Sequence, residues 1–214
     1  MALKDSKDVR VFVAEGCRMP KNPNITKAAE QIGDYLGRHK YAYLQGCNEE
    51  GLMGVTYKAF IKNSNKAKLV DLNVVYVDNY REGMVGEHIN SKCLNTRLKV
   101  FADNTDIIVV LPGANGTLHE FATFFELNRM YPGAYEIILV NIDGYYDNLI
   151  KFIRKAEREG LCVKGEFNER VRVVTSADEA CYLIKTYKSR PVKERMVSGY
   201  VPSKLNQKDE KNAK

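Results

Sequence analysis

Short apolar runs rich in β-branched residues alternate with longer segments of helical period along almost the whole chain, and this alternation constrains the fold most strongly. Runs such as DIIVVL (106–111) and YEIILVN (135–141) carry apolar side chains at consecutive positions, so both faces of each strand must be covered. Buried parallel strands have this composition, whereas half-exposed antiparallel strands alternate apolar and polar residues. The pattern therefore predicts a doubly wound, Rossmann-like α/β fold, with a parallel sheet and helices on both faces.

Strand and helix candidates follow one another without a break in composition. The strands are expected at 9–14, 41–46, 72–78, 106–111, 135–141 and 170–174. The helices are expected near 24–38, 51–62, 90–104, 116–130, 146–159 and 177–187. Residues 1–187 are therefore predicted to form a single α/β domain.

Positive charge is concentrated at the C-terminal end of the chain. The 214 residues carry a formal net charge of +6, and the stretch 188–214 contains eight lysine and arginine residues against three acidic ones. This stretch is polar and has no helical or strand period, which predicts a basic, disordered tail. Because no aromatic or arginine platform accompanies the charge, nucleic acid is not expected as a partner.

The distribution of apolar residues also bears on location. No apolar stretch approaches the roughly 20 residues that cross a bilayer. The first ten residues, MALKDSKDVR, have neither the apolar core of a signal peptide nor the pattern of a transit sequence. We therefore expect a cytoplasmic protein with no membrane partner.

Three of the predicted strands run into turns that contain glycine. The turns are AEGCR (14–18), QGCNEEGLMG (45–54) and LPGANGT (111–117). In a parallel sheet, ligands bind beyond the carboxyl ends of the strands, where the strand order reverses. A tight turn that simply needs glycine is the commoner explanation of any one of them, but three on one edge predict a nucleotide-sized ligand. None matches GxGxxG or a loop ending in GK[ST], so neither a dinucleotide nor ATP is indicated.

The third turn predicts a phosphate site. Pro112 ends the hydrogen-bond ladder of the strand, and Gly113 and Gly116 allow a close approach that a Cβ would block. The helix that begins near Thr117 offers free N–H groups and the positive end of its dipole to an anion. The residues expected to contact phosphate are Gly113, Ala114, Asn115, Gly116 and Thr117. The domain is thus predicted to bind a nucleotide.

Two charged residues are candidates for chemistry. Glu120 lies one turn into the helix, where a carboxylate would repel phosphate unless it acted on another part of the ligand, such as the sugar. Arg97 lies beside the apolar stripe of the preceding helix, which consists of Leu94, Leu98 and Phe101. Either residue alone is most simply a solvated surface charge. Only their pairing across one site would give them a catalytic role, and sequence spacing cannot establish that pairing.

These motifs resemble those of the Lonely Guy (LOG) family of cytokinin-activating nucleoside monophosphate phosphoribohydrolases, long labelled lysine decarboxylases. The family signature PGGxGTxxE is matched by residues 112–120, with Ala114 in place of the second glycine. The family segment MHxRK corresponds to residues 94–98, and GGGxxGLMG corresponds to residues 46–54. The resemblance covers about residues 9–187.

The resemblance implies an enzyme that cleaves the N-glycosidic bond of a nucleoside 5′-monophosphate, such as a cytokinin riboside monophosphate or AMP, and releases the free base and ribose 5-phosphate. It implies that the turn 113–117 binds the 5′-phosphate and that Arg97 and Glu120 are catalytic. It further implies at least a homodimer. The three histidines, His39, His88 and His119, have no metal-ligand spacing between them, so no metal is expected, and no cofactor is expected either. The substrate-binding residues expected from it are Gly16, Cys17, Gly46, Asn48, Gly51 and Met53.

Departures from the family pattern leave the base open. Asn95 and Leu98 replace the histidine and lysine around Arg97, and Cys47 and Asn48 replace two glycines. The base could therefore be a modified adenine, adenine or a pyrimidine, as in CMP. Further candidates for ribose or base contacts are Glu15 and Arg18.

Two other functions remain open at this stage. One is a non-catalytic nucleotide-binding protein of the same fold, because fold alone does not imply turnover. The other is a deoxyribosyltransferase-like enzyme in which Glu120 is a nucleophile. A decarboxylase would need a lysine to hold pyridoxal phosphate, and no lysine stands out for that role.

Overall fold

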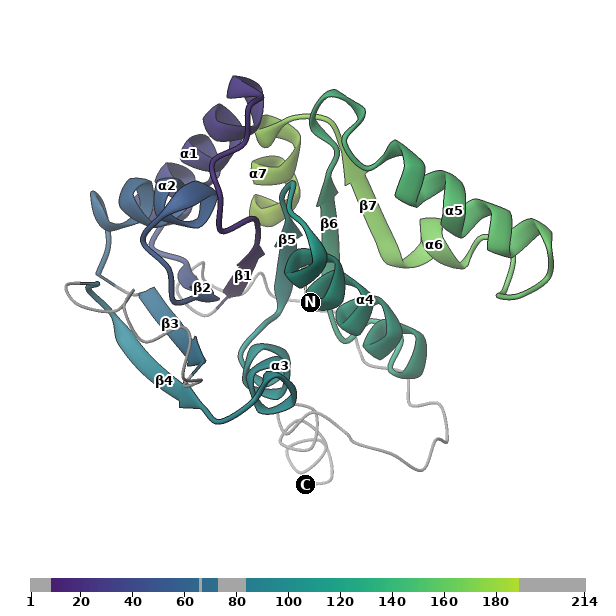
Figure 1. Cartoon of the computed structure of the whole chain (residues 1–214), viewed down its shortest axis with the longest axis horizontal. Helices are drawn as coiled ribbons and strands as arrows, with labels where there is room; N and C mark the ends of the chain where they lie inside the picture. Colours follow the sequence, from purple (N-terminus) through teal and green to yellow (C-terminus); the bar gives the residue numbers. More distant parts are fainter. Residues whose placement is uncertain (1–8, 66, 73–83, 189–214) are drawn as a thin grey trace.

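Seven parallel strands form one sheet in the order β4-β3-β2-β1-β5-β6-β7 (Figure 1). The computed structural model describes residues 9–65, 67–72 and 84–188. The strands are β1 (Arg10–Ala14), β2 (Ala42–Gly46), β3 (Ala67–Leu72), β4 (Glu87–Ser91), β5 (Ile107–Val110), β6 (Glu136–Val140) and β7 (Val171–Val174). The helices are α1 (Pro23–Arg38), α2 (Gly51–Ile61), α3 (Leu94–Asp103), α4 (Asn115–Met130), α5 (Asp147–Arg158), α6 (Glu166–Arg170) and α7 (Ala177–Lys185), with a 3₁₀ turn η2 (Ile142–Gly144). The doubly wound parallel sheet predicted from the sequence is confirmed.

The differences from the predicted elements lie mainly at one edge of the sheet. The strand predicted at 72–78 lies outside the described residues except for Leu72, which ends β3. Strand β4 was not predicted, and the helix expected from residue 90 is wrong for its first residues, because residues 87–91 are a strand. The sequence EHINS is polar and mostly exposed, so an edge strand of this kind has no apolar signal. The short helix α6 was also missed.

The strand order reverses between β1 and β5. From β1 the chain proceeds outward to β4, then returns to the other side of β1 to form β5. Val13 is in register with Val109, and Ala14 with Val110, so the carboxyl ends of the two strands emerge side by side. At the opposite end, the Arg10 guanidinium donates to Asp106 through Nε and Nη2 at 3.0 and 3.1 Å. The reversal point is where a ligand is expected in such a sheet.

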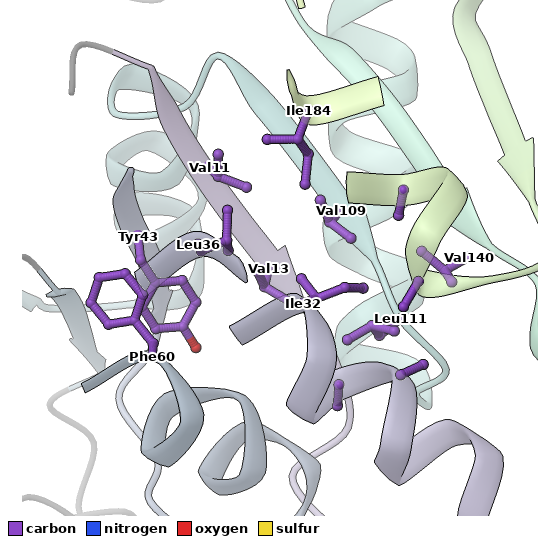
Figure 2. Packing of buried hydrophobic residues seen from close by; sticks show 14 of the residues in the cluster. Val11, Val13, Ile32, Leu36, Tyr43, Phe60, Val109, Leu111, Val140 and Ile184 are labelled. Carbon is purple, nitrogen blue, oxygen red and sulfur yellow. The ribbon is translucent and has the colours of Figure 1, made fainter. Parts of the chain in front are cut away.

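The side chains of β1 alternate between two hydrophobic cores. Val11 and Val13 face a core that includes residues of α1, α2 and α7. In Figure 2, Ile32 and Leu36 of α1 lie against this side of β1. The rings of Tyr43 and Phe60 pack beside them, with centroids 4.7 Å apart.

Phe12 and Ala14 face the second core, on the side of the sheet covered by α3, α4, α5 and α6. The Phe12 ring stacks on Phe101 of α3 with centroids 4.1 Å apart. In the aromatic helix α4, Phe121 and Phe124 are buried in this core, so these rings serve packing within the chain. Of the helices in the described part of the chain, none is both long and apolar enough to span a bilayer.

Helices α1 and α2 cross at unusually short range because glycines lie at the contact. A Cβ built on Gly33 would lie 2.2 Å from the carbonyl oxygen of Thr56, and one on Gly37 would lie 2.4 Å from that of Phe60. Both neighbours are backbone atoms and can yield only if the two helices separate. This contact holds α2, which begins with one of the glycine turns, against the rest of the domain.

We expect Gly33→Ala to lower the free energy of unfolding by about 1–3 kcal/mol, because the overpacked contact outweighs the better helix propensity of alanine. Chemical denaturation measures the change. Glu30→Ala on the exposed face of the same helix is the matched control, since its ion pair with Lys62 is solvent-exposed at 3.8 Å. Equal stability of the two variants would contradict the assigned contact.

Candidate active site

The three glycine turns meet at the reversal point of the sheet. The backbone N–H of Gly16, after β1, donates to the carbonyl of Pro112, after β5, at 3.3 Å. The N–H of Met53, in the first turn of α2, donates to the carbonyl of Gly16 at 3.2 Å. Gly51 has a φ of +59°, and a Cβ there would lie 2.2 Å from the carbonyl oxygen of Cys17. The walls of the site are therefore largely backbone.

The turn after β5 leads into α4 and leaves the first N–H groups of that helix free of helical partners. A Cβ on Gly113 would lie 2.0 Å from Oγ1 of Thr117, so the packing of the turn requires glycine at this position. Gly116 differs, because, apart from its chain neighbours and the backbone of its own helix, no atom of the described residues lies within 4 Å of a Cβ built there. The space beside Gly116 is therefore open.

Two tyrosines hold the turn 111–117, here called the phosphate turn after its predicted role, through hydrogen bonds from outside it. The hydroxyl of Tyr145 donates to the carbonyl of Gly113, and that of Tyr146 donates to the carbonyl of Leu111, each at 2.7 Å. These bonds occupy carbonyl oxygens of the turn. The tyrosines are about 30 positions further along the chain, and no sequence pattern connects them with the turn, so sequence reasoning missed them.

Arg97 projects from α3 toward the second glycine turn. Its Cζ lies 5.3 Å from the centroid of the Phe101 ring, over the ring face. A Cβ on Gly46 would lie 2.0 Å from its Nη2, so the guanidinium occupies space that only a glycine leaves open. The stripe predicted beside Arg97 is partly wrong: Phe101 is buried, but Leu94 is 53% exposed because it is the first residue of the helix.

Glu120 and Arg97 interact electrostatically, so the fold brings together the two residues that sequence spacing could not pair. Loss of hydration raises the pKa of the Glu120 carboxyl to about 7, and the positive charge of Arg97 opposes this rise. At neutral pH the carboxyl is thus poised between its two protonation states.

Glu15 adds a second carboxyl to the site. Its side chain is only 6% exposed, and the hydroxyl of Thr56 donates to its Oε2 at 2.7 Å. Its other oxygen, Oε1, is buried and has no hydrogen-bond partner. Burial raises the pKa of Glu15 well above its ordinary value, and the negative charge of Glu120 adds to the effect. An unpartnered buried oxygen costs roughly 1–3 kcal/mol in the absence of a ligand.

Other residues predicted to bind substrate differ in their burial and in their contacts. The Oδ1 of Asn48 accepts from the backbone N–H of Glu50 at 2.8 Å, which shapes the turn before α2. Cys47 is buried, with its thiol 3.6 Å from the sulfur of Met84. Cys17 is exposed and Met53 is buried. Their predicted roles in substrate binding remain predictions.

An active site could lie in two other kinds of location: a metal centre, or a cavity away from the glycine turns. Within the ranges that the structure describes, no three His, Cys, Asp or Glu side chains form a group that could hold a metal ion. A cavity of about 710 Å³ lies along the edge strand β7 and holds none of the predicted site residues. Its lining includes Arg154, Val173, Asp178 and Tyr182. The convergence of the glycine turns is therefore the better candidate for an active site.

Comparison with known proteins gives a consistent assignment. Residues 46–184 match the model of the family described as possible lysine decarboxylase. Cytokinin riboside 5′-monophosphate phosphoribohydrolase LOG7 of Arabidopsis thaliana is 27% identical over 180 residues, which cover 84% of this chain and 81% of that protein. Probable cytokinin riboside 5′-monophosphate phosphoribohydrolase LOGL5 of Oryza sativa subsp. japonica is 29% identical over 174 residues, or 81% and 71% of the two chains.

Solved structures share the fold at lower identity. The molybdenum cofactor binding protein from Rippkaea orientalis superposes with a TM-score of 0.62 at 20% identity, over 85% of this chain and 98% of that one. The Moco carrier protein from Chlamydomonas reinhardtii superposes with a TM-score of 0.60 at 15% identity, over 82% and 94% of the two chains. At these identities the likeness concerns the fold alone.

We expect Gly116→Ala to weaken the binding of ribose 5-phosphate at least about tenfold, a loss of about 1.4 kcal/mol. The added methyl would occupy the open space beside the free N–H groups of α4. The variant should be as stable as the parent, because alanine is the better helix former. Titration calorimetry measures affinity, and thermal denaturation measures stability.

Gly113→Ala is the informative comparison, because its Cβ meets Thr117 and disturbs the turn itself. That variant should lose both stability and affinity. Unchanged affinity for ribose 5-phosphate in Gly116→Ala would contradict phosphate binding at the N-terminus of α4.

Proposed function

The chain belongs to the family described as possible lysine decarboxylase, and from this membership and the geometry of the site we propose that it is a nucleoside 5′-monophosphate phosphoribohydrolase. The reaction cleaves the N-glycosidic bond and releases the free base and ribose 5-phosphate. The curated relatives that carry the name of this activity support the proposal. The observation that carries it is the meeting of the glycine turns beside the N-terminus of α4, where the charge of Arg97 lowers the pKa of Glu120.

Each part of the site has a role in this proposal. The N–H groups at the start of α4 bind the 5′-phosphate, which fixes the ribose next to Glu120. As the C1′–N bond breaks, positive charge builds on the ribose ring, and the ionised Glu120 stabilises that charge and orients the attacking water. Arg97 anchors substrate oxygens and keeps part of the Glu120 population ionised near neutral pH.

The decarboxylase description finds no support in the lysines near the site. A decarboxylase of this kind would hold pyridoxal phosphate on a lysine inside its pocket. Lys99 is the nearest candidate in sequence, but it is exposed on α3 and its ammonium group lies 2.6 Å from the Asp103 carboxylate. Lys99 therefore takes part in an ion pair on the surface of its own helix, which gives no support to a role in holding pyridoxal phosphate.

We propose an adenine-type base, in line with the names of the relatives, which act on cytokinin riboside monophosphates. AMP and CMP are also to be assayed, because this chain departs from the family pattern at four positions, Cys47, Asn48, Asn95 and Leu98. A homodimer and a cytoplasmic location stay predictions.

A carrier without turnover is the competing function, because the solved structures that share the fold are named a molybdenum cofactor binding protein and a Moco carrier protein. A carrier needs no carboxylate near a bound anion, whereas Glu120 lies one turn behind the phosphate turn. A transferase would pass the ribosyl group to a second base, which product analysis with an added free base detects.

We expect the purified protein to release free base from nucleoside 5′-monophosphates and not from the unphosphorylated nucleosides. Glu120→Gln should lower kcat by about 10²–10³-fold, because it removes the charge that stabilises the transition state. Chromatography of a panel of nucleotides measures release. The control is Glu126→Gln on the same helix, an exposed residue that pairs with Arg129.

Base release that survives in Glu120→Gln would contradict the catalytic role. Tight binding of nucleotides without release of any base would favour the carrier.

The rate should also depend on pH in a defined direction. Since ionised Glu120 is the active form and its pKa is about 7, we expect kcat/KM to fall about tenfold per pH unit below that midpoint. The phosphate of the substrate titrates lower, near pH 6. Initial rates from pH 5.5 to 8.5 test this, and a flat profile would be inconsistent with the role assigned to the carboxylate.

A further inference from the structure

The proposed hydrolysis leaves one requirement unmet. When the C1′–N bond breaks, its electron pair stays with the base, which must gain a proton to leave as a stable neutral molecule. Arg97 cannot supply that proton near neutral pH, because an arginine side chain does not deprotonate there. Glu120 acts in its ionised form and has no proton to give. Any inference about the source of this proton rests on the proposed function.

Glu15 occupies a position from which a proton could be delivered. It follows β1 directly, and the next residue, Gly16, is hydrogen-bonded to Pro112 of the phosphate turn at 3.3 Å. The carboxyl also interacts electrostatically with Glu120. Glu15 is therefore part of the same site as the two residues assigned to catalysis.

Thr56 engages one of the two oxygens of Glu15. The Thr56 hydroxyl, fully buried in α2, lies 2.7 Å from Oε2 and 3.4 Å from the carbonyl oxygen of Leu52. When the hydroxyl donates to Oε2, the proton of the neutral acid is on Oε1. Oε1 is buried and has no hydrogen-bond partner, so no protein group competes for a proton there.

The groups that face Glu15 act on its pKa in opposite directions. Glu120 of α4 contributes a negative charge, Thr56 of α2 donates one hydrogen bond, and Tyr43 of β2 contributes a phenol that donates to Gln45 at 2.9 Å. Burial raises the pKa of Glu15 well above its ordinary value, the hydrogen bond from Thr56 lowers it, and the charge of Glu120 raises it further, so the protonated form is favoured. Two neighbouring carboxyls whose environments favour opposite protonation states suit an acid and its partner.

We propose that Glu15 is the general acid of the reaction and that its Oε1–H protonates the departing base. The C1′–N bond breaks, the base keeps the electron pair and takes the proton of Glu15, and the oxygen of water bonds to C1′. The proton lost by that water passes to the Glu120 carboxylate. Exchange with solvent afterwards returns both carboxyls to their starting states.

A substrate whose leaving group needs no proton tests this role. In p-nitrophenyl β-D-ribofuranoside 5-phosphate the leaving group departs as a stabilised phenolate. Glu15→Gln keeps an oxygen that accepts from Thr56 but has no acidic proton. We expect this variant to lose about 10²–10⁴-fold in kcat on the best nucleotide substrate, yet to stay within about tenfold of the parent protein on the nitrophenyl substrate.

Glu120→Gln serves as the comparison, because it should lose activity on both substrates. Binding of ribose 5-phosphate by Glu15→Gln, followed by calorimetry, shows whether the variant is folded with an intact phosphate turn. A measurement on the unaltered protein needs no variant: its kcat on the nucleotide should fall at alkaline pH, whereas its kcat on the nitrophenyl substrate should not.

The outcomes separate the two proposals. Equal losses on both substrates in Glu15→Gln, or no loss on either, would overturn the role of Glu15 and leave the phosphoribohydrolase assignment intact. An alkaline limb that is identical for both substrates would overturn the role of Glu15 in the same way. An unaltered protein that cleaves neither substrate would instead overturn the proposed function, and the role of Glu15 with it.

Discussion

The parallel pairing of β1 with β5 is the constraint on which the candidate site depends. These strands are adjacent only because the chain returns across β1 after building the other half of the sheet, so two loops from distant parts of the sequence emerge side by side. Their apolar residues are covered on both faces by helices, which gives the pair little freedom to shift. The hydrogen bond from Gly16 to Pro112 extends this pairing beyond the strands and into the loops.

Backbone contacts then shape the site because glycines stand where side chains would collide. Gly113 admits Thr117, Gly46 admits the guanidinium of Arg97, and Gly51 admits the carbonyl of Cys17. The N–H groups in the first turn of α4 that lack helical partners favour an anion. Gly116 stands apart, because the protein itself leaves the space beside it open.

The charges in this region oppose stability and favour function. Glu15 and Glu120 lie near enough to interact, and both carboxyls lose hydration in the fold. One arginine, Arg97, is the opposite charge that lowers the pKa of Glu120. Neighbouring carboxyls whose pKa values are raised by burial are an arrangement seen where proton transfer is needed.

The sequence by itself determined the class of fold, the glycine turn after β5 and the family, because consecutive apolar residues in DIIVVL and EIILV and the glycines of LPGANGT are local signals. It could not reveal β4, whose polar residues form an exposed edge, or the tyrosines that hold the turn from about 30 positions away. Sequence spacing could not pair Arg97 with Glu120, whose joint role came only from the family resemblance, and the sequence named Glu15 only as a candidate for ribose or base contacts. The tertiary structure alone decided that Glu120 interacts electrostatically with both Arg97 and Glu15 and that Thr56 partners Glu15. The physical reason is that pairing, burial and protonation depend on distances between elements, which helix and strand periods do not encode.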